Sequence, residues 1–91
     1  HVFHLYVVAY KKRDLLIKFL KKKNIFVTIQ YPVPIHKMNA FKKNVHKHDL
    51  KNLNKTVRNS KDIFSLPLYP TIKKNNQLII INEINKFIKK N

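Results

Sequence analysis

The hydrophobic pattern at the start of the chain predicts a β-strand. Residues 2–10 read VFHLYVVAY, and this richness in β-branched and aromatic side chains is typical of strands. Alternation divides the run into two faces, one with Val2, His4, Tyr6 and Val8, the other with Phe3, Leu5, Val7 and Ala9. Because the second set is wholly apolar, we expect that face to be buried.

A helix and a second strand follow. Between Arg13 and Lys23, apolar side chains recur at helical spacing and lysines crowd the last turn, where the helix dipole favours cations. The chain has no glycine, so Asn24 is the natural residue to end this helix in the left-handed conformation. Residues 25–30 predict a strand, either paired in parallel with the first through a right-handed crossover or placed differently in a small mixed sheet.

Two prolines stiffen the segment after this strand. A residue before proline is pushed towards extended geometry, so we expect Tyr31 and Val33 to be extended and residues 31–34 to form a rigid stretch. The basic residues 42–52 predict a loop, with Asp49 or Asn52 capping a helix that runs to about residue 62.

The last third of the chain predicts an extended segment and a closing helix. Pro67 and Pro70 interrupt residues 63–70, which favours a short strand there. Residues 73–90 carry a broad apolar face at helical spacing, and Thr71 could cap this helix.

The order of these elements predicts one small α/β domain over residues 1–91. A chain of this length builds one small core, with marginal stability expected. His1 opens the sequence and the strand pattern begins at Val2, so we expect a piece of a longer protein. No apolar run approaches the roughly 20 residues that span a bilayer, and the absence of cysteine fits a cytoplasmic protein.

The formal net charge of +16 allows two interpretations. It can indicate a binder of nucleic acid or of an anionic membrane, or a lysine-rich composition on solvated helix faces. Arg13 and Arg58 are the only arginines, whereas base readout and bidentate phosphate recognition favour arginine. We therefore favour solvated faces over nucleic acid as the explanation of the charge, and we expect no membrane partner.

No catalytic set is apparent in the sequence. The acidic residues Asp14, Asp49, Asp62 and Glu83 form no useful pair at helical spacing, and the absence of glycine excludes every glycine-rich phosphate loop. His36 with His46 and His48 could bind a metal, but a solvated loop is the favoured interpretation, so no metal is expected.

The proline-stiffened segment contains the best binding candidates. His36 follows it, and a rigid stretch that presents a phenol and an imidazole suits an anionic or hydroxyl-rich ligand, because little entropy is lost on binding. A structural loop with a chance histidine is an equal alternative. His4 can be a hydrogen-bonded interior or interface histidine, or the wall of a pocket.

Four short segments together resemble a known family. FHLYVV (3–8), YPVPIH (31–36), AF (40–41) and SLPLYP (65–70) occur in the order and spacing of the C-terminal domain of the DegT/DnrJ/StrS family of sugar aminotransferases. The resemblance implies the small domain of a fold-type-I pyridoxal-phosphate enzyme, a small mixed β-sheet covered by helices. It also implies a homodimeric parent whose Schiff-base lysine lies in a large domain outside this chain, so the chain alone is expected to be inactive.

The resemblance also implies a substrate and a set of pocket residues. The parent would transfer an amino group from glutamate or glutamine to a nucleotide-linked keto-sugar, in amino-sugar, surface polysaccharide or glycan biosynthesis. Tyr31, Pro34 and His36 would lie towards the substrate, with His4 and Gln30 as further pocket candidates. Gln30 and residues 37–39 depart from the family pattern and are where altered specificity is expected. The alternative function is a stand-alone basic module that binds nucleic acid or another polyanion.

Overall fold

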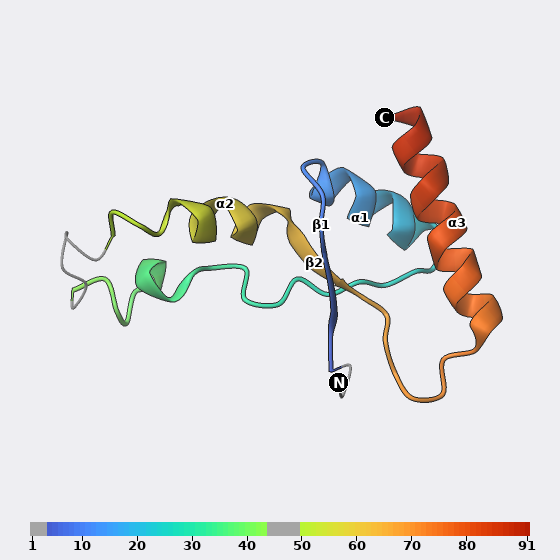
Figure 1. The fold of residues 1–91 in the computed structure, drawn as a ribbon, viewed down its shortest axis with the longest axis horizontal. Helices are drawn as coiled ribbons and strands as arrows, with labels where there is room; N and C mark the ends of the chain where they lie inside the picture. The colour runs from blue at the N-terminus through green and yellow to red at the C-terminus, as the bar shows by residue number, and fades with distance from the viewer. Residues whose placement is uncertain (1–3, 44–49) are drawn as a thin grey trace.

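The computed structural model describes residues 4–43 and 50–91. The elements in chain order are β1 (Tyr6–Ala9), α1 (Arg13–Lys22), the short 3₁₀-helix η1 (Ile35–Lys37), α2 (Asn54–Asp62), β2 (Ile63–Leu66) and α3 (Lys74–Lys90). The strands, α1 and α3 form a body, and residues 31–43 and 50–62 project from it as an arm that contains η1 and α2 (Figure 1). The predicted small α/β domain with helices around a sheet is confirmed.

The sheet is built around β2. β1 pairs with β2 in antiparallel register, with Val7 opposite Ser65. On the other side of β2, Ser65 exchanges two backbone hydrogen bonds with Thr28, with N···O distances of 2.7 and 3.1 Å. β2 therefore lies between β1 and the segment around Thr28, which run in the same direction. Direct parallel pairing of residues 2–10 with 25–30 is wrong, and the alternative strand order is the observed one.

The buried face of β1 is the opposite of the one predicted. Val8 stands opposite Phe64, which is 2% exposed, and packs against the core. Val7 is 52% exposed and Ala9 is also exposed. Tyr6, on the same face as Val8, is 56% exposed, so only Val8 of this face packs against the core. The choice of face is made by β2, whose Phe64 belongs to the core with the helices.

The core lies between the sheet and the antiparallel helices α1 and α3. Leu16 and Leu20 from α1, Phe64 from β2, and Ile80 and Phe87 from α3 are all buried. The Phe19 and Phe87 rings lie 5.2 Å apart between centroids. Full burial of each such side chain stabilises the fold by roughly 1.5–3 kcal/mol, so these few contacts dominate the stability of the body.

The end of α1 confirms the role predicted for Asn24. This residue has φ 57°, in the left-handed region. The Ile25 amide donates to the Leu20 carbonyl at 3.0 Å, and the Asn24 amide donates to the Lys21 carbonyl at 3.1 Å. These are the two bonds of a Schellman motif, and the burial of Leu20 and Ile25 supplies its hydrophobic contact.

The helix caps predicted from the sequence are wrong where the structure describes them. Leu53 precedes α2 without a side-chain cap, so Asn52 does not cap it, and Asp49 lies outside the described residues. Lys73 precedes α3 in extended geometry and also provides no side-chain cap, so Thr71 does not have that role. The first turns of α2 and α3 are exposed, so water can accept hydrogen bonds from their free amides and no side-chain cap is needed.

Arg13 joins the body to the arm. Its Nη1 donates to the Ser60 carbonyl at 2.9 Å and to the Ile63 carbonyl at 3.3 Å, at the end of α2. The Tyr10 amide also donates to the Asp62 carbonyl at 2.9 Å. The side chain of Arg13 is only 12% exposed. The base of the arm is therefore fixed by a nearly buried guanidinium and a backbone hydrogen bond.

Candidate functional site

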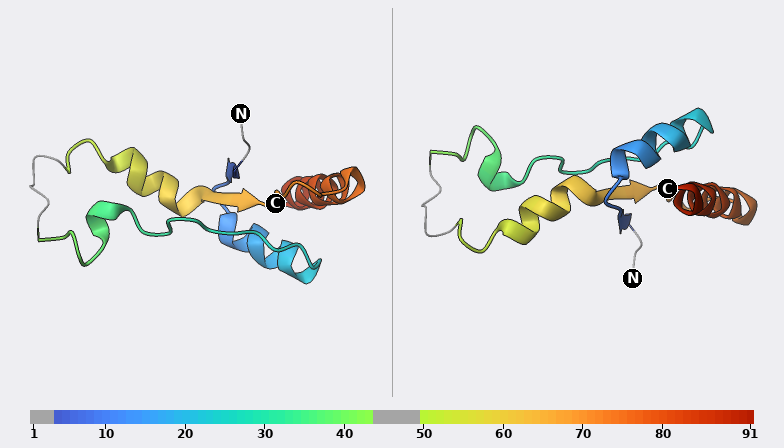
Figure 2. Two further views of the ribbon diagram at one scale, coloured as in Figure 1. Left: turned by 90° about the horizontal axis from the view of Figure 1, so that it is seen from below. Right: turned by 90° about the horizontal axis from the view of Figure 1, so that it is seen from above.

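The arm carries an open groove. η1 and its flanking loops face α2 along the arm, which lies well away from α3 (Figures 1 and 2). The open groove between them has a volume of about 780 Å³. Its lining is mainly apolar, with Val33, Ile35, Met38 and Phe41 from one side and Leu53 and Ile63 from the other. Such a groove suits a ligand or partner with an apolar part.

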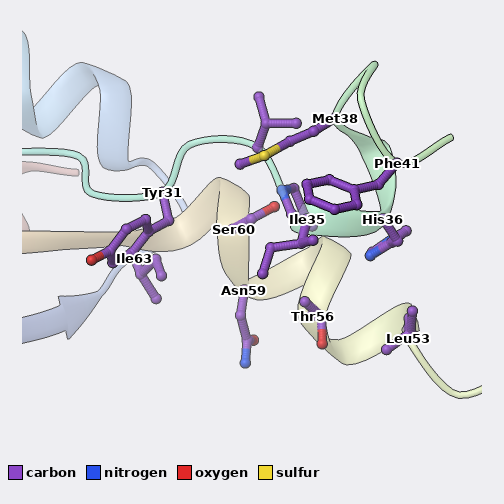
Figure 3. A pocket seen from close by; sticks show the side chains of 12 residues that line it. Tyr31, Ile35, His36, Met38, Phe41, Leu53, Thr56, Asn59, Ser60 and Ile63 are labelled. Atoms are coloured by element: carbon purple, nitrogen blue, oxygen red, sulfur yellow. The ribbon is translucent and has the colours of Figure 1, made fainter.

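Polar groups mark the two ends and one wall of this groove. Tyr31 lies at the end nearest β2, and His36 lies at the far end beside η1 (Figure 3). α2 contributes Thr56, Asn59 and Ser60, whose three- and four-residue spacings place them on one helix face. The Ser60 hydroxyl donates back to the Val57 carbonyl at 2.8 Å. The remaining groups can donate to or accept from a ligand that bears hydroxyl groups.

The backbone that presents Tyr31 and His36 is not uniformly extended. Tyr31 has φ 60°, so the extended geometry predicted for it is wrong, and the chain turns sharply there. A residue other than glycine is uncommon in the left-handed region, and it keeps this conformation where the surrounding structure enforces it. After the turn, the Lys37 amide donates to the Pro34 carbonyl at 2.8 Å and the Met38 amide to the Ile35 carbonyl at 3.0 Å. These bonds fix the single turn that carries His36.

The structure brings together only part of the set predicted from the sequence. Tyr31, Pro34 and His36 line the groove. Gln30 does not line it: its Oε1 accepts a hydrogen bond of 2.9 Å from the Ser65 hydroxyl, at the sheet. His4 is exposed before β1 and is also absent from the groove. A ligand in the groove would therefore meet Tyr31 and His36 without His4 or Gln30.

Sequence reasoning missed the contribution of α2. Thr56 and Asn59 face the groove because they lie one helical turn apart. The spacing of Thr56 and Asn59 could be seen in the sequence. The helix has no strong apolar stripe, so the face that it turns towards the rest of the arm could not be predicted.

The lining of the groove lacks several of the side chains that carry covalent or metal chemistry. None of its lining residues is a carboxylate, cysteine or lysine. Among residues 4–43 and 50–91, no group of three metal-ligating side chains occurs. His46 and His48 lie outside the described residues, so the metal site considered with His36 is not tested. In the same described ranges, no helix is long and apolar enough to cross a membrane.

The described residues do not fit pyridoxal phosphate either. A Schiff base needs a lysine at the site, and no lysine lines the groove. The whole chain lacks glycine, so it cannot form the glycine-rich backbone loop that cradles a phosphate. Among the described residues, the groove therefore offers neither a Schiff-base lysine nor a glycine-rich phosphate loop.

The comparison with known proteins defines the class. Residues 1–85 match the model of the DegT/DnrJ/EryC1/StrS aminotransferase family, and the chain belongs to this family. This confirms the resemblance inferred from the four short segments.

Three relatives align over nearly the whole chain. A pleiotropic regulatory protein of Geobacillus stearothermophilus is 33% identical over 96% of the chain. A dTDP-3-amino-3,4,6-trideoxy-α-D-glucose transaminase of Micromonospora megalomicea subsp. nigra is 37% identical over 97%. A dTDP-3-amino-3,6-dideoxy-α-D-galactopyranose transaminase of Aneurinibacillus thermoaerophilus is 26% identical over 96%. In each case the chain spans 23% of the length of the relative.

Proposed function

We propose that this chain is the C-terminal small domain of a pyridoxal-phosphate-dependent aminotransferase that acts on a nucleotide-linked keto-sugar. The observation that carries the proposal is the family match over residues 1–85, together with two relatives named as dTDP-amino-sugar transaminases. The relative named as a regulatory protein means that family membership alone does not decide the activity, so a reaction assay is needed.

The division of labour follows from the groups that the chain has and lacks. A large domain outside the chain would carry the Schiff-base lysine and bind the cofactor, which supplies the electron sink for amino transfer. The arm would form one wall of the substrate pocket, with the Tyr31 hydroxyl and the His36 imidazole available to sugar hydroxyl groups. Pro34 and the η1 turn would hold these groups in place. The 91-residue chain alone would have no transaminase activity.

The wider proposal concerns the parent protein. It would be a cytoplasmic homodimer that takes its amino group from glutamate or glutamine and contributes to amino-sugar, polysaccharide or glycan biosynthesis. The small domain would pack against the large domain of the same protein. His4 and Gln30 remain pocket candidates in this assembly, since residues of the large domain could extend the pocket beyond the arm.

The test is a reverse transamination with the full-length protein. The protein loaded with pyridoxal phosphate is given dTDP-3-amino-3,6-dideoxy-α-D-galactopyranose and 2-oxoglutarate, and the glutamate formed is measured. The same assay with dTDP-3-amino-3,4,6-trideoxy-α-D-glucose probes the other relative's sugar. Formation of glutamate with either sugar is the expected result, whereas no amino transfer with any dTDP-amino sugar would refute the proposal. Turnover by the 91-residue chain alone would contradict the division of labour.

A variant of His36 tests the role of the arm. His36→Ala should raise KM for the amino sugar about tenfold with a smaller change in kcat, since a binding contact worth roughly 1.4 kcal/mol is lost. Lys55→Gln is the matched control, because Lys55 lies on α2 but does not line the groove. Equal effects of both substitutions would remove His36 from the proposed pocket.

A further inference from the structure

A second cluster of exposed apolar side chains lies at the opposite end of the molecule from the arm. The turn that ends α1 meets the loop before α3 and the first half of that helix, away from η1 and α2 (Figure 1). A shallow cleft of about 400 Å³ there is lined by Phe26, Tyr69 and Ile79, with Lys23 at its edge. These three apolar side chains are 66%, 47% and 54% exposed. We call this surface, with the lysines described next, the basic tip.

Five lysines lie in or next to the segments that form this cleft, and Lys23 lines it. Lys21, Lys22 and Lys23 lie consecutively at the end of α1, and Lys73 and Lys74 precede and begin α3. All five are exposed. No acidic residue occurs in residues 15–30 or 63–82. Glu83 on α3 is paired with Lys86 at 2.6 Å, and the charge of Lys23 also helps to lower the pKa of its carboxyl, so one carboxylate lies near the five lysines. The tip therefore combines a positive potential with exposed aromatic and aliphatic groups.

Local folding forces this combination onto one surface. The Schellman motif buries Ile25 against Leu20, so the next residue along the extended chain, Phe26, points outward. On α3, Ile80 is buried, and Ile79 lies about 100° away around the helix, outside the core. Lys23 lines the cleft, and Lys73 and Lys74 lie in the chain between the lining residues Ile72 and Asn76, so both lysine runs adjoin this surface.

We propose that the basic tip binds the surface of an anionic phospholipid bilayer. Lysines near such a surface are attracted to phosphate and carboxylate headgroups, and aromatic or aliphatic side chains enter the boundary between headgroups and acyl chains. The tip of a second copy fits poorly, because its lysines would face the lysines of this tip and the contact would be repulsive. The phosphates of a nucleic acid could bind the lysines, but a nucleic acid has no apolar layer into which Ile79 could insert. The proposal revises the expectation from sequence that no membrane is a partner.

The inference does not depend on the proposed reaction. The tip and the groove share no lining residue, and they lie at opposite ends of the structure (Figure 1). Membrane binding can therefore fail while transamination succeeds, and the reverse is also possible. The two assays separate these outcomes.

The experiment is co-sedimentation of the full-length protein with lipid vesicles. Vesicles of phosphatidylcholine mixed with phosphatidylserine should bind the protein, and vesicles of phosphatidylcholine alone should bind it weakly. The triple variant K21Q/K22Q/K23Q should lose roughly a hundredfold in affinity, since each lysine near the surface contributes about a factor of five. The matched control is K55Q/R58Q/K61Q, which removes the same charge from α2. The affinity of this control for the vesicles should fall by less than about threefold.

A second pair of variants tests the apolar part of the tip. F26S/I79S should weaken binding about tenfold or more and should leave mainly salt-sensitive binding, because the groups that enter the bilayer boundary are gone. Leu15→Ser is its control, because Leu15 is 55% exposed on α1 but does not line the cleft. Far-ultraviolet circular dichroism confirms that each variant is folded.

Several results would overturn the proposal. Absence of binding to the phosphatidylserine vesicles, or equal binding to both kinds of vesicle, would remove the anionic bilayer as the partner. Equal losses in the α1 and α2 triple variants would show that total charge, and not the tip, is responsible. Tighter binding of a single-stranded DNA oligonucleotide than of vesicles, with the same dependence on Lys21–Lys23, would assign the tip to nucleic acid.

Discussion

Replacement of Arg13 tests how the arm is attached to the body. Arg13→Met keeps a long apolar stem but removes the Nη1 donor from the Ser60 and Ile63 carbonyls. It also removes the Nε bond of 2.9 Å to Asp14, whose side chain is 79% exposed. Hydrogen bonds from charged donors contribute roughly 1.5–3 kcal/mol when buried, whereas the exposed pair with Asp14 contributes little.

The expected loss is about 2 kcal/mol in the free energy of unfolding. This lies below the sum of two charged hydrogen bonds because the 3.3 Å contact to Ile63 is long and because water can reach the last carbonyls of α2 once the guanidinium is gone. Arg13→Lys should cost about half as much, because one ammonium can reach one carbonyl but cannot serve both in the same geometry.

Urea unfolding followed by circular dichroism measures these differences, with the midpoint expected to fall by about 1–2 M for Arg13→Met. Amide hydrogen exchange locates the effect: protection in α2 should fall more than protection in α1 or α3, because the arm would open before the core. Asp14→Asn is the control and should change stability by less than about 0.5 kcal/mol. A stable Arg13→Met variant, or an equal loss in Asp14→Asn, would refute this account of the attachment.

Three further predictions concern the body. Leu20→Ala should cost about 3 kcal/mol, measured by urea unfolding, because Leu20 is 0% exposed at the centre of the core; a loss below 1 kcal/mol would contradict it. Asn24→Val should lower thermal stability by about 1 kcal/mol while Asn24→Gly does not, since φ is 57° there; equal values would contradict the strain argument. The hydrogen bond from Lys86 lowers the pKa of the Glu83 carboxyl. The stabilising contribution of Glu83 is therefore present above its ordinary pKa and is lost as pH falls through the lowered value. Thermal unfolding of the protein and of Glu83→Gln at a series of pH values tests this, because the variant should lack this part of the loss of stability in acid.

The helices were the most predictable part of the fold. α1 and α3 combine helical spacing of apolar residues with lysines in their last turns, and the structure begins and ends both within one residue of the expected positions. Asn24 was predictable for a different reason, since a chain without glycine has few other residues that tolerate the left-handed region. Local signals sufficed wherever the outcome depended on neighbouring residues.

The sheet was less predictable because its order depends on contacts between distant segments. The sequence places β1 and residues 25–30 on either side of a helix, which favours a parallel pair, yet β2 inserts between them. Ser65 is the key residue: it is 3% exposed and satisfies Thr28 through the backbone and Gln30 through its hydroxyl. Nothing in the local pattern of residues 63–66 indicates that both sides of this strand are paired.

Only one wall of the candidate site was predictable, because the other wall comes from a distant segment of the chain. The prolines indicated that residues 31–36 form a stiff segment, and Tyr31, Pro34 and His36 do share one groove. The opposite wall comes from α2, about twenty residues later, and its Thr56 and Asn59 carried no signal of their own. His4 and Gln30 were grouped with the arm through the family resemblance, but the strand order directs Gln30 to Ser65 instead.

The attachment of the arm links this geometry to the proposed specificity. Apart from Ile63, the residues that line the groove belong to the arm. The base of the arm therefore sets where Tyr31 and His36 lie relative to residues outside the arm that the same ligand contacts. Arg13 lines no part of the groove, yet it holds the end of α2 against the body through two carbonyls. A loosened base would let the groove shift as a unit relative to any cofactor held elsewhere, and small displacements of positioning groups are costly in catalysis. Under the proposed function, Arg13 would influence substrate selection through the position of the groove alone, whereas loss of His36 would remove a direct contact with the substrate.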